Sequence, residues 1–146
     1  MTNPLSLRKA SIADRAFLLS LRKLTMTEHL ATANIYMDDV KHLERIDEFF
    51  EDSLIVEYKA QPIGLIKLAH LPDRLHIRQL QIMPKFQGKG VGGKILQRIF
   101  KRANQLNLPV SLNVLKKNPA LHLYQRYGFE IKKETELEYY MLVKNT

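Results

Sequence analysis

The 146-residue chain has the length of one ordinary domain and can bury a core of its own, so we expect a single domain over residues 1–146. It contains no cysteine, which excludes a disulfide framework, a thiolate nucleophile and the usual cysteine-based zinc sites. No apolar run approaches the ~20 residues of a membrane span, and the first residues lack the apolar core of a secretory signal. These features predict a soluble, cytoplasmic protein with no membrane partner.

The formal net charge of +8 is distributed unevenly along the chain. Between Asp73 and Glu130 every charged residue is Lys or Arg, and these positive charges exceed the net charge of the whole chain. The remainder of the chain is therefore slightly acidic. Such asymmetry attracts a polyanion, either a nucleic acid or a multiply phosphorylated cofactor. A solvated basic surface without a partner would show the same pattern.

The first third of the chain predicts a strand and two helices. Residues 5–10 have the pattern of a strand, and Ile12–Leu24 places apolar residues at helical spacing. Residues 26–39 match no clear pattern. Val40–Ser53 predicts a second helix whose acidic side faces solvent.

The rest of the chain alternates strands with helices. Strands are expected at 53–59, 62–70, 75–83 and 110–115. A third helix should begin at Gly92, and a short fourth helix should occupy residues 118–128. The tail from Phe129 to Lys144 has the length of two strands broken near residues 136–138. This alternation predicts an α+β (mixed α/β) fold.

The stretch QGKGVGG, residues 87–93, places a glycine-rich turn between a strand and a helix. Its glycines match G-x-G-x-x-G, but the dinucleotide interpretation needs an acid about 20 residues later, and none occurs before Glu130. No G-K-[ST] closes a Walker loop either. The remaining chemistry is an anion cradle of free N–H groups, with Lys89 and Lys94 adding charge. A tight turn without a ligand would use the same glycines.

A second element follows the strand VSLNVL. Asn118 is placed to cap a helix, Pro119 suits its first position, and Gly128 suits its end. Tyr124 and Tyr127 on this helix also fit as ordinary core aromatics.

Together these elements resemble the GNAT superfamily of acetyl-CoA-dependent N-acetyltransferases. The family's cofactor motif, Q/R-x-x-G-x-G/A, is matched by Gln87, Gly90 and Gly92, directly after a strand that ends in LQIMP. Its later motif is matched by Leu112, Val114, Asn118, Tyr124, Gly128 and Phe129. The opening LRKASIADRAFLLSLR also looks like the start of the family, so the resemblance covers nearly the whole chain.

The resemblance implies a GNAT-like fold, a central twisted mixed sheet of about six to seven strands flanked by about four helices. It implies direct transfer of acetyl from acetyl-CoA, used as a co-substrate without a metal, to a primary amine. In the family the turn binds the pyrophosphate and the preceding strand runs beside pantetheine. The implied cofactor-binding residues are Leu80, Gln81, Ile82, Gln87, Gly88, Lys89, Gly90, Val91, Gly92, Asn118 and Tyr124.

For the chemistry, the resemblance implies that the Tyr124 phenol lies near the cofactor sulfur and protonates the departing thiolate. A backbone N–H near Ile82 is the candidate for polarising the thioester carbonyl. Many relatives carry a glutamate on the strand 75–83, but this chain has no carboxylate there. Glu28, with its neighbour His29, is therefore the candidate base, although an exposed Glu needs no catalytic role.

The resemblance leaves the acceptor open as a small-molecule or peptide amine, and family members often form homodimers. Two alternatives remain. The missing strand carboxylate is compatible with an acyl-CoA-binding sensor that transfers nothing. A basic nucleic-acid-binding module would explain the charge, but the chain shows no helix-turn-helix or aromatic RNA-binding signature, and we expect no nucleic-acid partner.

Overall fold

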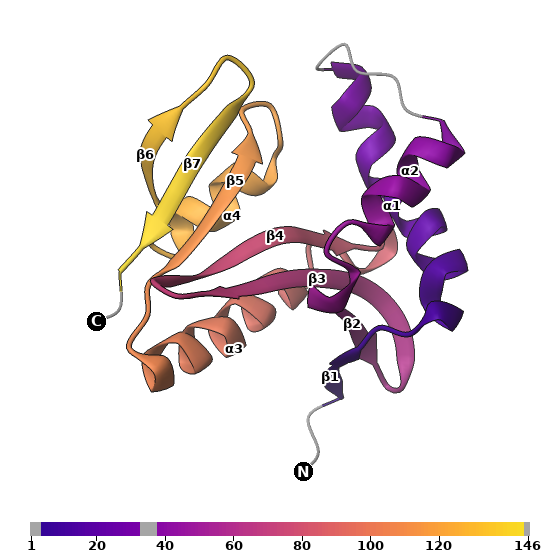
Figure 1. Ribbon diagram of the computed structural model, residues 1–146, viewed down its shortest axis with the longest axis horizontal. Coiled ribbons are helices and arrows are strands. Elements are labelled where there is room, and N and C mark those ends of the chain that lie inside the picture. The colour runs from indigo at the N-terminus through magenta and orange to yellow at the C-terminus, as the bar shows by residue number, and fades with distance from the viewer. Residues whose placement is uncertain (1–3, 33–37, 145–146) are drawn as a thin grey trace. The chain divides into compact units, whose positions relative to one another are not determined.

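The computed structural model of the protein describes residues 4–32 and 38–144, with backbone alone for residues 26–32. The strands of this described part are β1 (Leu5–Lys9), β2 (Ser53–Tyr58), β3 (Gln61–Leu71), β4 (Arg74–Ile82), β5 (Val110–Leu115), β6 (Glu130–Glu134) and β7 (Glu138–Val143). Its α-helices are α1 (Arg15–Thr32), α2 (Asp39–Asp47), α3 (Val91–Leu106) and α4 (Ala120–Arg126). The strands hydrogen-bond in the order β1-β2-β3-β4-β5-β7-β6 (Figure 1). A seven-stranded mixed sheet with four helices confirms the predicted fold class for these residues.

The chain divides into two compact units. Of the described residues, the first unit contains those up to 68 together with 79–87, and the second contains 69–78 together with those from 88 onward. Strands β3 and β4 each contribute residues to both units. That the whole chain acts as one domain stays a prediction.

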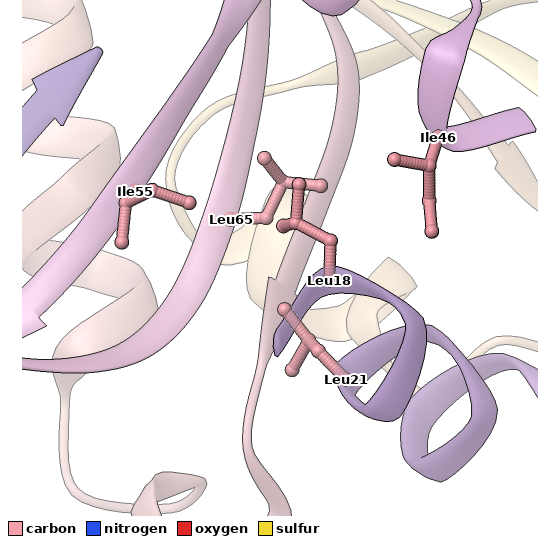
Figure 2. Packing of buried hydrophobic residues seen from close by; sticks show 5 residues of the cluster. All are labelled: Leu18, Leu21, Ile46, Ile55 and Leu65. Atoms are coloured by element: carbon pink, nitrogen blue, oxygen red, sulfur yellow. The ribbon is translucent and has the colours of Figure 1, made fainter. Parts of the chain in front are cut away.

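The core of the first unit lies where α1 and α2 meet β2 and β3. Leu18, Leu21, Ile46, Ile55 and Leu65 form a cluster of buried side chains from these four elements (Figure 2). Antiparallel pairing of β2 with β3 places Ile55 opposite Leu65. Burial of each such side chain stabilises the folded state by about 1.5–3 kcal/mol.

The helices of the first unit differ from the predicted ones at their ends. Ile12–Asp14 forms a 3₁₀ turn, and α1 continues to Thr32 through residues that gave no clear pattern. The prediction of a helix over Val40–Ser53 was wrong in its second half, because α2 ends at Asp47. Phe49 adopts a left-handed backbone with φ 54°, which an α-helix cannot continue through, and a 3₁₀ turn then leads into β2.

Lys67 is a buried lysine on β3 with 2% of its surface exposed. Its ammonium donates hydrogen bonds to the backbone carbonyls of Arg45 at 3.1 Å, Ile46 at 3.1 Å and Glu48 at 2.6 Å. These carbonyls lie at the C-terminus of α2, where backbone acceptors lack intrahelical partners and the helix dipole favours a positive charge. Lys67 therefore fastens the end of α2 to the sheet.

The second unit packs α3 and α4 with β5, β6 and β7. The apolar stripe predicted for the third helix is confirmed, since Ile95, Leu96, Ile99 and Ala103 are buried. Strand β5 pairs antiparallel with β7, and it pairs in parallel with β4 over three residues, from Leu75 opposite Val110 to Ile77 opposite Leu112.

The C-terminal elements follow the prediction closely. The short helix begins at Ala120, two residues later than predicted, and ends at Arg126. The tail forms β6 and β7, which pair antiparallel. Within the described ranges, no helix has the length and apolarity that crossing a membrane requires.

We predict that Lys67→Met lowers the free energy of unfolding by about 2–4 kcal/mol, because it leaves the carbonyls at the end of α2 buried without their charged donor. Urea denaturation measures this change. Lys41→Met, at an exposed position of α2, is the matched control and should change stability by less than about 0.5 kcal/mol. Equal stability of the two variants would contradict the role given to Lys67.

A second prediction concerns acid stability. Arg8 donates hydrogen bonds to both carboxylate oxygens of Asp14, at 2.9 and 2.8 Å, and the Ser11 N–H donates another at 2.7 Å. The bonds from Arg8 are the main cause that lowers the Asp14 pKa to about 2, against about 3.9 in an unfolded chain. The carboxylate therefore stabilises the fold above about pH 4, and this contribution disappears as the pH falls toward 2.

We expect that contribution to be about 1–2 kcal/mol, since the partly exposed Arg8 is screened by solvent. Asp14→Asn should lower stability by this amount at pH 7 and by much less near pH 2. The measurement is urea denaturation of both proteins across this range. A constant difference between them at every pH would show that the ionised carboxylate is not responsible.

Candidate functional site

The glycine-rich turn after β4 has a left-handed backbone at two positions. Gly88 has φ 75° and Gly90 has φ 82°, backbone conformations that residues other than glycine adopt only with strain. An added Cβ at either glycine would find no other atom within 4 Å. The backbone of the turn is therefore open on this side, and a ligand can approach it closely.

The N-terminus of α3 follows directly and has no capping side chain. Gly90 is its N-cap, and its carbonyl accepts from the Lys94 N–H at 3.1 Å. The N–H groups of Val91, Gly92 and Gly93 precede that first intrahelical bond. The first turn of α3 contains no acidic residue. Uncapped N–H groups at the positive end of a helix dipole form a site for an anion.

The next two glycines serve packing against α4. A Cβ on Gly92 would lie 3.0 Å from Leu123 Cδ2, and a Cβ on Gly93 would overlap the hydroxyl of Tyr127. The cofactor role that the sequence motif implies for the Gly92 backbone stays a prediction, and the lack of a side chain at Gly92 and Gly93 also permits close helix contact. This contact places α4, which carries Tyr124, against the first turn of α3.

Tyr124 is a buried tyrosine with 6% of its surface exposed. Its ring packs edge-on against Phe129, with centroids 5.8 Å apart. Burial raises the pKa of the phenol to about 12, so the group stays protonated at neutral pH. Within the described residues its hydroxyl makes no hydrogen bond, which leaves a proton that the fold does not use.

Asn118 and Gln87 each hold the local structure of their own unit. In the second unit, Asn118 Oδ1 accepts from the Ala120 N–H at 2.9 Å just before α4, but the N-cap of α4 is Pro119, one residue later than predicted. In the first unit, Gln87 Nε2 donates to the Ile82 carbonyl at 2.9 Å. That bond ties the start of the glycine turn to the end of β4.

Leu80, Gln81 and Ile82 form the end of β4 and belong to the first unit. The parallel ladder with β5 stops at Ile77, so these residues lie beyond it. Glu28 and His29, the candidates for the base, fall in α1, but their side chains lie outside what the structure describes.

A polar group at the start of β4 escaped the sequence analysis. Ser111 Oγ accepts from Arg74 Nε at 3.1 Å and lies 2.7 Å from His76 Nδ1. Burial, together with the positive charges of Arg74 and Arg78, lowers the His76 pKa and keeps the imidazole neutral. Only the parallel register, in which His76 lies opposite Ser111, reveals this group.

Two hollows in the second unit lie along α3, with volumes of about 540 and 170 Å³. Phe100 and Asn104 line both, and none of the predicted cofactor residues lines either. In the ranges that the structure covers, no three His, Cys, Asp or Glu side chains gather as a metal site would need.

A model of the acetyltransferase (GNAT) family matches residues 18–129. A search of the curated proteins found no match.

Several solved structures share the fold. The PaiA N-acetyltransferase from Thermoplasma acidophilum, in complex with coenzyme A, is 20% identical with a TM-score of 0.75, and the alignment covers 99% of each chain. An acetyltransferase from Thermus thermophilus is 18% identical with a TM-score of 0.79, over 97% of each chain. Arabidopsis thaliana Naa50, in complex with the bisubstrate analogue CoA-Ac-MVNAL, is 18% identical with a TM-score of 0.71, over 97% of this chain and 99% of that one.

Proposed function

The chain belongs to the acetyltransferase (GNAT) family, and on this premise we propose that it moves an acetyl group directly from acetyl-CoA to a primary amine. The observation that carries the proposal is the left-handed turn at Gly88 and Gly90, which opens onto the uncapped start of α3. The acceptor is a small-molecule or peptide amine. The complex of Arabidopsis Naa50 with CoA-Ac-MVNAL supports keeping a peptide among the candidates.

In this proposal the turn holds the cofactor phosphates. The open space beside Gly88 and Gly90 admits a phosphate, and the N–H groups of Val91 and Gly92 donate to it. Lys89 adds positive charge within a stretch that has no acidic residue between Asp73 and Glu130. The geometry of the turn thus fits a pyrophosphate.

The pantetheine arm would follow β4. Leu80, Gln81 and Ile82 lie past the last paired residues of β4 and β5, so the β5 ladder does not use their backbone groups. We assign the hydrogen bonds of the arm to these backbone groups, and a further bond to the amide of Asn118. The Ile82 N–H is our candidate donor to the thioester carbonyl.

The chemistry then requires few groups. Acetyl-CoA supplies the activated acetyl group, and a chain without cysteine cannot carry that group on a thiolate, which favours direct transfer. The Tyr124 phenol, with a pKa of about 12, is a donor that remains protonated while negative charge develops on the sulfur. Glu28 remains our candidate base for the amine.

We also propose a cellular compartment and a set of partners for the protein. Zero cysteines favour a reducing compartment, and we place the protein in the cytoplasm. We propose no metal, no nucleic acid and no membrane partner, and we propose that two copies can pair as a homodimer.

We predict that the protein binds acetyl-CoA with an affinity that falls as salt rises, because phosphate contacts are screened. Gly90→Asn should weaken binding by about tenfold or more, since Asn tolerates a left-handed backbone but its side chain fills the space beside the turn. Isothermal titration calorimetry at low and high salt measures both effects.

Gly128→Asn is the matched control, because Gly128 also has a positive φ, of 97°, but ends α4 instead of opening α3. It should lose similar stability and keep its affinity. Equal weakening in both variants would attribute the loss at Gly90 to backbone strain. Unchanged affinity in a folded Gly90→Asn protein would contradict the phosphate cradle.

A further prediction tests Tyr124. Tyr124→Phe keeps the ring and removes the proton, so kcat should fall by roughly 10²-fold while the affinity for acetyl-CoA barely changes. Thermal stability should also hold, because the hydroxyl bonds to nothing in the described fold. The measurement is release of free thiol across a library of amines.

The pH profile gives an independent check. With a phenol pKa of about 12, the wild-type rate should rise with pH as the acceptor amine deprotonates. At any pH up to about 10 this rate should show no decline, because the phenol keeps its proton there. Normal turnover of Tyr124→Phe would show that Tyr124 only packs beside the site and donates no proton. Binding of acetyl-CoA without thiol release from any amine would instead favour the sensor.

A further inference from the structure

The side chain of Gln81 is a buried polar group that the fold leaves unused. Only 5% of the residue is exposed, and its Nε2 is buried without a hydrogen-bond partner. A buried donor without a partner is costly, and most such groups in native proteins are paired. A ligand that accepts a hydrogen bond would complete the group.

The direction of this side chain follows from its neighbour. The Met83 N–H donates to the Ile63 carbonyl at 2.8 Å, which continues the pairing just past the end of β4. Met83 packs against the cluster that includes Leu18 and Leu65. Side chains two residues apart on an extended strand point to the same face, so Gln81 projects to the face of the first unit that α1 and α2 cover.

The backbone at Gln81 is held firmly. A Cβ added to Gly64 on β3 would lie 2.5 Å from the Gln81 carbonyl oxygen and 2.9 Å from Ile82 Cδ1. This close approach of β3 fixes the main chain of β4 at the residues to which we assign the pantetheine arm. The side-chain amide of Gln81 can still rotate about its last bond. This rotation exchanges the positions of its oxygen and nitrogen atoms, so the NH₂ group can turn toward a bound ligand.

We propose that the side-chain amide of Gln81 binds the acceptor, and that the acceptor carries a carbonyl oxygen close to its reactive amine. This inference rests on the proposed acetyl transfer. Backbone groups of a strand lie in the plane of the sheet, where they would hold the thioester, whereas side chains stand out of that plane. An amine attacks a carbonyl carbon from outside the carbonyl plane, and with the thioester held in the plane of the sheet this approach comes from a face of the sheet, as the Gln81 side chain does.

The chemistry of the amide selects the class of acceptor. An uncharged NH₂ donor pairs with a carbonyl or carboxylate oxygen. A simple alkyl polyamine offers no oxygen, so it would leave the donor buried and unpaired. Amines next to a carbonyl, as in an amino-acid amide or a peptide N-terminus, satisfy it.

The test compares glycinamide, which has the carbonyl, with propylamine, which lacks it, at equal concentrations of free amine. Gln81→Met removes the donor, and Gln81→Glu replaces it with a carboxylate. Both variants should lower kcat/KM for glycinamide about tenfold more than they lower kcat/KM for propylamine, a difference of about 1.4 kcal/mol. Because each variant is compared with the wild type, the different basicities of the two amines cancel.

Two control variants separate recognition from general damage. Gln79→Met changes a half-buried glutamine of the same strand, and Ser53→Ala removes another buried polar atom without a partner. Neither should alter the preference between the amines. Equal losses for both amines in the Gln81 variants, or an unchanged preference, would overturn the proposal.

A measurement on the wild-type protein does not depend on turnover or on the folding of variants. With coenzyme A present, glycinamide should shift the side-chain ¹H–¹⁵N resonances of Gln81, and propylamine should not. No shift at saturating glycinamide would overturn the inference even if acetyl transfer is observed. Failure of every amine to release thiol would refute the proposed function, while the NMR result would still decide the role of Gln81.

Discussion

The left-handed backbone at Gly88 and Gly90 is the constraint on which the candidate site depends. It lies directly before α3, and it leaves the N-cap of α3 without a side chain. Any residue with a Cβ would bring strain and would occupy the space beside the turn. The same two glycines therefore set the helix start and keep its free N–H groups accessible.

The two following glycines connect this turn to the catalytic proposal. Gly92 and Gly93 allow Leu123 and Tyr127 to pack against the first turn of α3. Tyr124 follows Leu123 in α4, so this contact also fixes the position of the helix that carries Tyr124. A short helix with few bonds of its own gains a fixed position from this contact.

Burial gives the unused polar groups their chemical character. It raises the pKa of the Tyr124 phenol to about 12, so the hydroxyl keeps its proton at neutral pH. Gln81 presents an amide donor in surroundings where an unmet hydrogen bond is costly. Lys67 shows the opposite case, because the carbonyls at the end of α2 satisfy its ammonium.

Much of the fold could be read from hydrophobic spacing, because α3 buries one regular stripe of apolar side chains and β5 buries its alternating Val110, Leu112 and Val114. The end of α2 could not be predicted in this way, since nothing in the sequence pattern around Phe49 indicates a left-handed backbone. The glycine motif located the turn, but separating ligand access at Gly90 from helix packing at Gly93 required the position of Tyr127. The sequence named Gln81 only as a residue of the strand beside pantetheine, because burial of its side-chain amide depends on long-range packing that no local pattern records.

The central claim is that the free N–H groups of this turn bind the phosphates of coenzyme A. The most direct measurement is a titration of ¹⁵N-labelled protein with coenzyme A at low salt, followed through the backbone amides. We expect large, saturable shifts at Gly88, Gly90 and Val91, reversed by added salt. Saturable binding that leaves these three amides unshifted would contradict it.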